Sequence, residues 1–248
     1  MSRRLKLIVA YDGAPFAGWQ SQSHRNTVQD HLERAFRTIN GARVQVHGAG
    51  RTDSGVHALA QCAHADVGNE RLQPARWVAA LNGQLPPQLR VLRCQFAAKD
   101  FHARFSAVGK VYRYRIWTGS VLPPLEYGRV WHLPADLALD RLRSAAAEFL
   151  GRHDFKQFAA NRGHRVTDTV RTIRALAVRR HGHVLTLEFD GDGFLYKMVR
   201  LIVGALAECA GGKIAIGDLR NRLSGKTVEQ SSRLAAPAGG LYLVRVRY

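Results

Sequence analysis

The alternation of apolar and polar positions divides the chain into short segments that predict both strands and helices. In the N-terminal part, short apolar or alternating runs that end at turn residues predict strands at 5–11, 44–46, 60–67 and 89–97. One helix is expected from Thr27, which can cap it, to Gly41, with apolar residues recurring on one face. A second helix is expected to begin at Pro74. This part of the chain therefore predicts the order β-α-β-β-α-β.

The C-terminal part predicts the same order a second time. Strands are expected at 108–117, 170–180, 184–189 and 241–248, the middle two forming a hairpin about Gly182. Helices are expected at 139–149, where Gly151 stops the helix, and from Phe194, with a short additional helix near 218–223.

The two patterns together predict a fold of the α+β class. We expect two β-α-β-β-α-β halves that form one largely antiparallel mixed sheet of about eight strands, with helices on one face. The other face would be free for a ligand. The expected division is an N-terminal half, 1–105, and a C-terminal half, 106–248.

The composition adds a strong positive charge to this picture. The formal net charge is +18 and the isoelectric point is near 10.8, which favours a polyanionic partner, nucleic acid ahead of an acidic membrane surface. Genomic base composition that favours arginine is the alternative explanation. The three cysteines are far apart, so neither a disulfide framework nor a zinc site is expected. Without a signal peptide or a long apolar run, we expect the protein in the cytoplasm.

The loop at 48–57 is the first candidate for chemistry. It sets Arg51 and Asp53 two residues apart among three glycines, in the connection between two predicted strands. The alternative is a surface turn in which Asp53 and Ser54 bind their own backbone.

Two further candidates come from the C-terminal half. Arg200 interrupts the apolar face of a predicted helix, where it either extends to solvent or reaches a buried carboxylate such as Asp53. Tyr112 and Tyr114 share one face of a strand and Arg113 and Arg115 the other. A tyrosine there either stacks on a base or packs half-buried in the sheet.

Other signals are weak. The glycines at 48–50 lack the residues of a phosphate-binding loop, and no histidine pair has metal-ligand spacing beside carboxylates. Basic clusters could contact phosphates or simply be solvated; they lie at Arg162, His164 and Arg165, at Arg179 and Arg180, and at Arg220 and Arg222.

A series of short motifs resembles one known family. They are Tyr11-Asp12-Gly13, Phe16, Gly18-Trp19-Gln20, Thr27-Val28-Gln29, the segment 50–58, Leu81-Asn82, the segment 101–105, Lys110, Tyr112, Tyr114, His153-Asp154-Phe155, Arg171-Thr172-Ile173, Gly193-Phe194-Leu195, Met198-Val199-Arg200 and Gly204. In this order, and over nearly the whole chain, they resemble the tRNA pseudouridine synthase A (TruA) family. Gln88 departs from the pattern, since the family often has Asp there, and so does the connection 157–168.

The resemblance implies an enzyme that converts uridine to pseudouridine at positions thirty-eight to forty of the tRNA anticodon arm. It implies that Asp53 is the catalytic aspartate, that Arg51 helps to extrude the target base, that Tyr112 is an active-site tyrosine and that Arg200 is the partner of the aspartate. It also implies the pseudouridine synthase fold and a homodimer that binds tRNA.

This chemistry suits a carboxylate, because the reaction breaks the C1′–N1 bond and makes a C1′–C5 bond without net redox or hydrolysis. No cofactor and no metal are therefore expected. Whether Asp53 attacks the ring, attacks the sugar or removes a sugar proton stays open.

Two other classes of function remain as alternatives. A non-catalytic RNA-binding protein of the same fold would gain nothing from Asp53, because an anion opposes a phosphate backbone. A Mg²⁺-dependent nuclease would need a second carboxylate, and none lies near Asp53 in the sequence.

Overall fold

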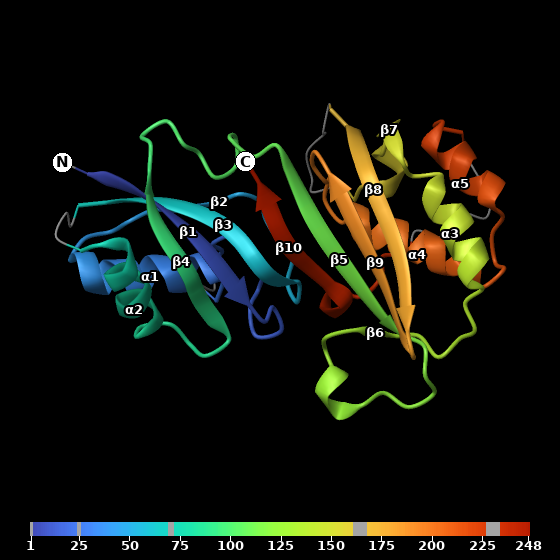
Figure 1. Cartoon of the computed structure of the whole chain (residues 1–248), viewed down its shortest axis with the longest axis horizontal. Coiled ribbons are helices and arrows are strands. Elements are labelled where there is room, and N and C mark those ends of the chain that lie inside the picture. Colours follow the sequence, from blue (N-terminus) through green and yellow to red (C-terminus); the bar gives the residue numbers. More distant parts are fainter. Residues whose placement is uncertain (1, 24–25, 69–71, 161–167, 227–233) are drawn as a thin grey trace. The chain divides into compact units, whose positions relative to one another are not determined.

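The structure, a computed structural model, describes residues 2–23, 26–68, 72–160, 168–226 and 234–248. It comprises two compact units (Figure 1). The first unit consists of Met1–Val108 together with Tyr242–Tyr248, and the second of Gly109–Leu241. The last strand, which the sequence pattern assigns to the C-terminal half, therefore lies with the N-terminal unit.

The first unit is built on a mixed sheet. Its strands are β1 (Arg3–Tyr11), β2 (Val46–Gly48), β3 (His57–Val67), β4 (Leu89–Ala97) and β10 (Leu241–Arg247). They lie in the order β4-β1-β3-β10, with β2 paired to β3. β1 is antiparallel to both of its neighbours, whereas β10 is parallel to β3. This parallel pairing brings the first residues of β10 beside the first residues of β3, where the Asp53 loop ends.

Two helices, α1 (Val28–Asn40) and α2 (Pro74–Asn82), belong to this unit. α1 begins at a capping box: the Thr27 side chain accepts a hydrogen bond from the Asp30 backbone, and the Asp30 carboxylate accepts one from the Thr27 backbone. It ends at Gly41, whose φ of 71° is in the left-handed region. The buried face of α1 includes Phe36, which packs against Trp77 of α2 with ring centroids 5.5 Å apart.

The second unit holds a largely antiparallel sheet and three α-helices among its described residues. Its strands are β5 (Gly109–Trp117), β6 (Trp131–His132), β7 (Gly151–Asp154), β8 (Val170–His181) and β9 (Val184–Gly191), in the order β5-β9-β8-β7, with the short β6 parallel to β5. The α-helices are α3 (Leu139–Ala147), α4 (Met198–Ala210) and α5 (Ile216–Leu223). Short 3₁₀ helices are η1 (Pro124–Glu126), η2 (Lys156–Phe158) and η3 (Ala238–Gly240). α3 lies against α4, α5 and β8 (Figure 1), so the apolar faces of the helices and the sheet form one core.

The α+β class and the largely antiparallel pairing of the strands are confirmed, with ten strands among the described residues instead of about eight. The exact repetition of β-α-β-β-α-β is confirmed for the N-terminal half and is wrong for the C-terminal half, which adds β6 and β7. Gly151, expected to stop a helix, begins β7 with a φ of 95°, and α3 ends earlier, at Ala147. The strand expected at 44–46 lies at Val46–Gly48.

The helix expected from Phe194 begins only at Met198. Lys197, just before it, has a φ of 58°, in the left-handed region that residues with a side chain seldom adopt. Phe194 is outside the helix and packs edge-on against Tyr112, at 5.1 Å between centroids. The apolar periodicity is therefore correct for α4, but a tertiary contact holds its first expected turn in another conformation.

No helix in the described part of the chain is both long and apolar enough to cross a membrane.

Candidate active site

Asp53 lies in a tight turn between β2 and β3. The Val56 backbone N–H donates to the Asp53 carbonyl oxygen at 3.1 Å, and Gly55 has a φ of 77°. A turn of this kind needs a residue that tolerates positive φ at its third position, and glycine does so without strain. Arg51 is exposed, Thr52 is buried and Asp53 is partly buried. Arg51 and Asp53, the two candidate residues of this loop, thus flank the buried Thr52.

The segment that follows β1 packs directly on this loop. The Trp19 backbone N–H donates to the Thr52 carbonyl at 3.0 Å, and the Ser54 hydroxyl donates to the Phe16 carbonyl at 3.2 Å. A Cβ at Gly18 would come within 2.7 Å of the Thr52 carbonyl oxygen, so only glycine allows the two backbones to lie this close. The segment 11–20, which holds the first motifs of the family, therefore packs against the Asp53 loop and stabilises its conformation.

Buried polar groups fix the loop from the inside. The hydroxyls of Tyr11 and Thr52 are 2.9 Å apart, and burial raises the pKa of Tyr11, so this phenol stays neutral. The fully buried Gln61 on β3 donates to the Gly50 carbonyl at 2.8 Å. These contacts leave the loop little freedom, which is the condition for holding a reactive carboxylate in one place.

β10 supports the exit of the same loop. Tyr242 pairs with His57, the first residue of β3, and their rings stack with centroids 4.7 Å apart. The His57 ring is buried, and its Nδ1 accepts the Gly13 backbone N–H at 3.0 Å. The histidine is therefore a structural link between three segments.

Arg51 is held by a side chain to which the sequence analysis gave no role. Its Nε donates to Gln20 Oε1 at 3.0 Å. Gln20 belongs to the motif Gly18-Trp19-Gln20, which was noted for the resemblance alone; spacing along the chain gives no sign that it reaches Arg51.

In the second unit, β5 carries the two tyrosines on the face that packs into the core. Tyr112 is 8% exposed and touches Phe194, whereas Tyr114 is fully buried and donates to the Pro237 carbonyl at 2.7 Å. Burial raises the pKa of Tyr114, although the positive charge of Arg200 acts in the opposite direction. Tyr114 is thus a packing residue, while Tyr112 stays the candidate next to the N-terminal end of α4.

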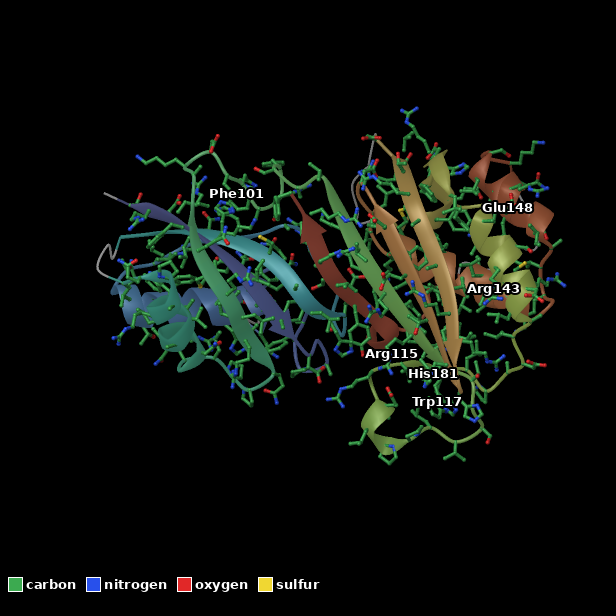
Figure 2. All side chains as sticks on the ribbon, viewed as in Figure 1. Phe101, Arg115, Trp117, Arg143, Glu148 and His181 are labelled. Atoms are coloured by element: carbon green, nitrogen blue, oxygen red, sulfur yellow. The ribbon has the colours of Figure 1, made fainter. Side chains whose placement is uncertain are left out.

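The arginines on the opposite face of β5 are paired with carboxylates. Arg113 contacts Glu188 of β9 at 2.8 Å, and Arg115 contacts Glu126 of η1 at 2.9 Å (Arg115 is labelled in Figure 2). These two residues are therefore tied to the fold by local ion pairs.

Arg200 lies in the first turn of α4 and is bound to the segment at 234–236. Its Nε donates to the Ala236 carbonyl at 2.7 Å, and the Ala236 backbone N–H donates to the Arg200 carbonyl at 3.0 Å. The side chain is partly buried. Arg200 belongs to the second unit and Asp53 to the first, so their pairing stays a prediction from the sequence.

The other basic clusters differ from one another. Arg220 forms a two-pronged ion pair with Glu148, at 2.6 and 2.7 Å (Glu148 is labelled in Figure 2). Arg222 is 3% exposed and covers the Phe158 ring at 4.2 Å. Arg179 and Arg180 are exposed. The cluster at Arg162, His164 and Arg165 lies outside the described residues.

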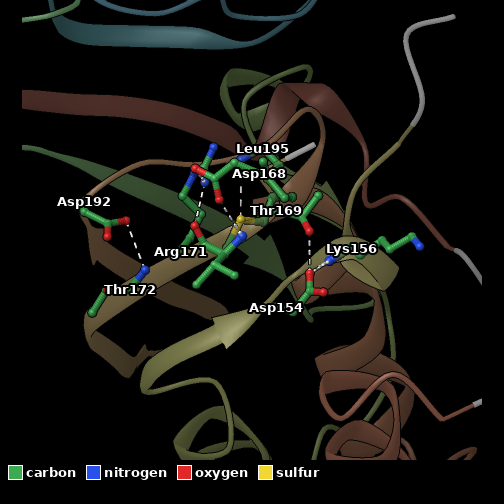
Figure 3. A network of polar contacts seen from close by, with 10 residues as sticks. Asp154, Lys156, Asp168, Thr169, Arg171, Thr172, Asp192 and Leu195 are labelled. Carbon is green, nitrogen blue, oxygen red and sulfur yellow. Dashed lines mark hydrogen bonds and ion pairs between the residues drawn. The ribbon is translucent and has the colours of Figure 1, made fainter. Parts of the chain in front are cut away.

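A polar network surrounds the motif at 171–173 (Figure 3). Arg171 lies 3.3 Å from the Asp168 carboxylate, and the Thr172 backbone donates to Asp192 at 3.0 Å. Thr169 donates to Asp154 at 2.6 Å. The network links the start of β8 to the end of β7 and to the residue after β9.

Among the described residues, no group of three or more histidine, cysteine or acidic side chains could hold a metal ion. All three cysteines, Cys62, Cys94 and Cys209, are buried and free.

Known proteins of one family match this chain over most of its length. The model of the tRNA pseudouridine synthase family matches residues 7–106 and 145–248. A tRNA pseudouridine synthase A of Akkermansia muciniphila is 44% identical over 99% of this chain and 95% of its own length. Those of Acetivibrio thermocellus and Latilactobacillus sakei are 41% and 42% identical, over 99% and 100% of this chain and the whole of their own lengths.

In the crystal structure of the archaeal box H/ACA sRNP Nop10-Cbf5 complex, a chain 12% identical matches 97% of this chain with a TM-score of 0.41. This chain spans about half of that longer chain, since 48% of it is covered.

The family match over most of the chain defines the class first: this is a pseudouridine synthase, an isomerase. Within that class, the chain belongs to the tRNA pseudouridine synthase A (TruA) family. The resemblance noted in the sequence is thereby confirmed.

Proposed function

We propose that this enzyme converts uridine to pseudouridine at positions thirty-eight, thirty-nine and forty in the anticodon stem-loop of tRNA. The observation that carries the proposal is the turn at Asp53, which is anchored by buried polar groups. A carboxylate on a loop with buried polar anchors has a fixed position, as covalent or acid-base chemistry requires. The strongly basic composition supports tRNA as the substrate.

The proposed roles follow the chemistry of the side chains. Asp53 is the catalytic carboxylate, and Arg51, two residues earlier and more exposed, holds the state in which the target base is extruded from the stack. Tyr112 stacks on that base or transfers a proton to it. Arg200 is the ion-pair partner that keeps Asp53 ionised. Apart from Asp53, none of these groups is required to form a bond with the substrate.

We also propose that the active form is a homodimer and that it works in the cytoplasm. Both proposals come from the sequence and the family. Three buried, unpaired cysteines are compatible with a reducing compartment.

The test is to incubate the protein with undermodified tRNA in the presence of EDTA and to map pseudouridine base by base. Product at these three positions with metal removed supports the proposal. Pseudouridine at other positions would overturn the proposed site of action. Cleaved RNA that appears only on addition of Mg²⁺ would instead indicate a nuclease.

A further inference from the structure

A chain of side-chain hydrogen bonds runs from Arg51 into the interior of the first unit. Arg51 Nε donates to Gln20 Oε1 at 3.0 Å, and Gln20 Nε2 donates to Gln29 Oε1 at 2.8 Å. Gln29 Nε2 in turn donates to Glu33 Oε1 at 2.8 Å. The chain of four residues links the exposed arginine to α1, which carries both Gln29 and Glu33.

The direction of this chain is fixed by its inner end. A carboxylate can only accept, so the amide nitrogen of Gln29 must face Glu33, and its oxygen must face Gln20. Gln20 then has to present its own nitrogen to Gln29 and its oxygen to Arg51. If the Gln20 amide were flipped, its nitrogen would face the Arg51 donor and its oxygen would face the Gln29 acceptor, so both hydrogen bonds would be lost.

Backbone N–H groups also donate hydrogen bonds to the side chains of Gln29 and Glu33. The Ser21 backbone N–H donates to Gln29 Oε1 at 2.9 Å, and the Val46 backbone N–H donates to Glu33 Oε1 at 3.1 Å. Gln29 is 7% exposed, so its partners are not exchanged freely for water. The acceptor that meets Arg51 is therefore held by α1 and by the start of β2.

We propose that Gln20 and Gln29 are positioning residues for Arg51 in the reaction. The inference rests on the proposed role of Arg51 in holding the extruded base. The five N–H groups of a guanidinium lie in one plane, so a fixed acceptor at Nε sets the orientation of that plane. The N–H groups of the two terminal nitrogens are then oriented toward the substrate in advance, so less side-chain conformational entropy is lost when the substrate binds.

Gln22 offers a matched control. It is the same residue type in the same loop, is exposed, and donates to the Ala17 carbonyl at 2.9 Å. Truncation of Gln22 removes a contact within the loop. Gln22 is not part of the series of hydrogen bonds that ends at Arg51. A comparison of Gln20→Ala with Gln22→Ala thus separates positioning from general loosening.

The experiment measures single-turnover pseudouridine formation at saturating tRNA, together with tRNA affinity and melting temperature. We expect Gln20→Ala to slow the step about tenfold, the loss typical of one hydrogen bond to a charged group, with affinity and melting temperature nearly unchanged. Gln22→Ala should keep the wild-type rate. Gln20→Glu restores an oxygen acceptor for Arg51 and should recover part of the rate.

A double-mutant cycle tests whether the effect passes through Arg51. In an Arg51→Ala background, Gln20→Ala should slow the reaction no further, because the group it positions is gone. Independent losses from the two changes would overturn the inference, as would a wild-type rate for Gln20→Ala. A wild-type enzyme without product would instead refute the proposed function, and normal turnover by Arg51→Ala would refute the proposed role of that arginine.

Discussion

Thr52 shows how a residue without a proposed role in the reaction lies between two residues, Arg51 and Asp53, for which we propose one. Its side chain is turned inward to the Tyr11 hydroxyl, while its neighbours Arg51 and Asp53 are both more exposed. A cation and an anion therefore flank the buried threonine, with Arg51 exposed and Asp53 partly buried.

Replacing the proposed catalytic carboxylate gives the first prediction. Asp53→Asn should abolish pseudouridine formation, because the amide is neither a nucleophile nor a base of comparable strength. tRNA binding should survive or tighten, since an anion has left a basic surface. Binding and product assays on the same preparation check both statements, and measurable turnover by Asp53→Asn would remove Asp53 from the mechanism.

His64 gives a prediction on pH. The ring is 2% exposed and its Nδ1 accepts the Ala103 backbone N–H at 3.1 Å. Burial, aided by the charges of His47, His102 and Arg4, lowers the pKa of His64 from 6.5 to about 4. Between these pH values the unfolded chain binds a proton that the folded chain refuses, so acidification over this range favours unfolding.

His64→Asn keeps an acceptor near the position of Nδ1 and removes the titration. Between pH 7 and 5, the variant should lose less stability than the wild type, by about 1 kcal/mol after allowance for solvent screening. Denaturant unfolding at the two pH values measures this difference. Equal losses would show that the histidine is not a source of the acid sensitivity.

Among the elements, α4 is the one most completely enclosed. Nearly all of its residues from Met198 to Ala210 are buried, and Arg200 is held by the Ala236 backbone. Gly204 is one turn further along the same helix, and a Cβ there would overlap the Leu234 carbonyl oxygen. The absence of a side chain at this position is what lets the segment at 234–236 lie against the helix and bind Arg200.

Two glycine substitutions test this packing. Alanine normally favours a helix over glycine, yet Gly204→Ala should destabilise the protein by about 1 to 3 kcal/mol, because the overlap is with backbone that cannot rotate away. Gly217→Ala in α5 is the control: it meets no atom within 4 Å, so stability should be unchanged or slightly higher. Thermal melts of both variants decide the matter, and a stabilised Gly204→Ala would contradict the proposed close approach.

For the molecule as a whole, basic residues outnumber the acidic residues with which they could form ion pairs. The chain has 37 lysines and arginines against 19 acidic residues, so a complete set of ion pairs would still leave a charge of +18. Several pairs do form, among them Arg4–Asp66, Arg113–Glu188 and Arg220–Glu148. The remaining excess favours a phosphate backbone, which binds by releasing its counterions.

The affinity for tRNA should therefore depend steeply on salt. If six or more phosphates are contacted, affinity should fall about 10³-fold between 50 and 200 mM salt. Fluorescence titrations at several KCl concentrations give the slope directly. Affinity that stays flat over this range would mean that the excess charge serves another purpose.

The sequence by itself determined those elements whose cause is local. α1 follows from the Thr27 cap, one apolar face and Gly41, and the strand expected at 89–97 has the same bounds as β4. The hairpin about Gly182 follows from its turn residues. The motifs also fixed the family, because their order along the chain is specific.

Tertiary structure alone decided contacts between residues far apart in the chain. The packing of Phe194 on Tyr112 delays the start of α4, and β10 crosses to lie parallel to β3. Gln20, Gln29 and Arg51 meet although 31 positions separate the first from the last. Periodicity and capping report only interactions within a few residues, whereas these arrangements arise from burial and hydrogen bonding that close large loops of chain.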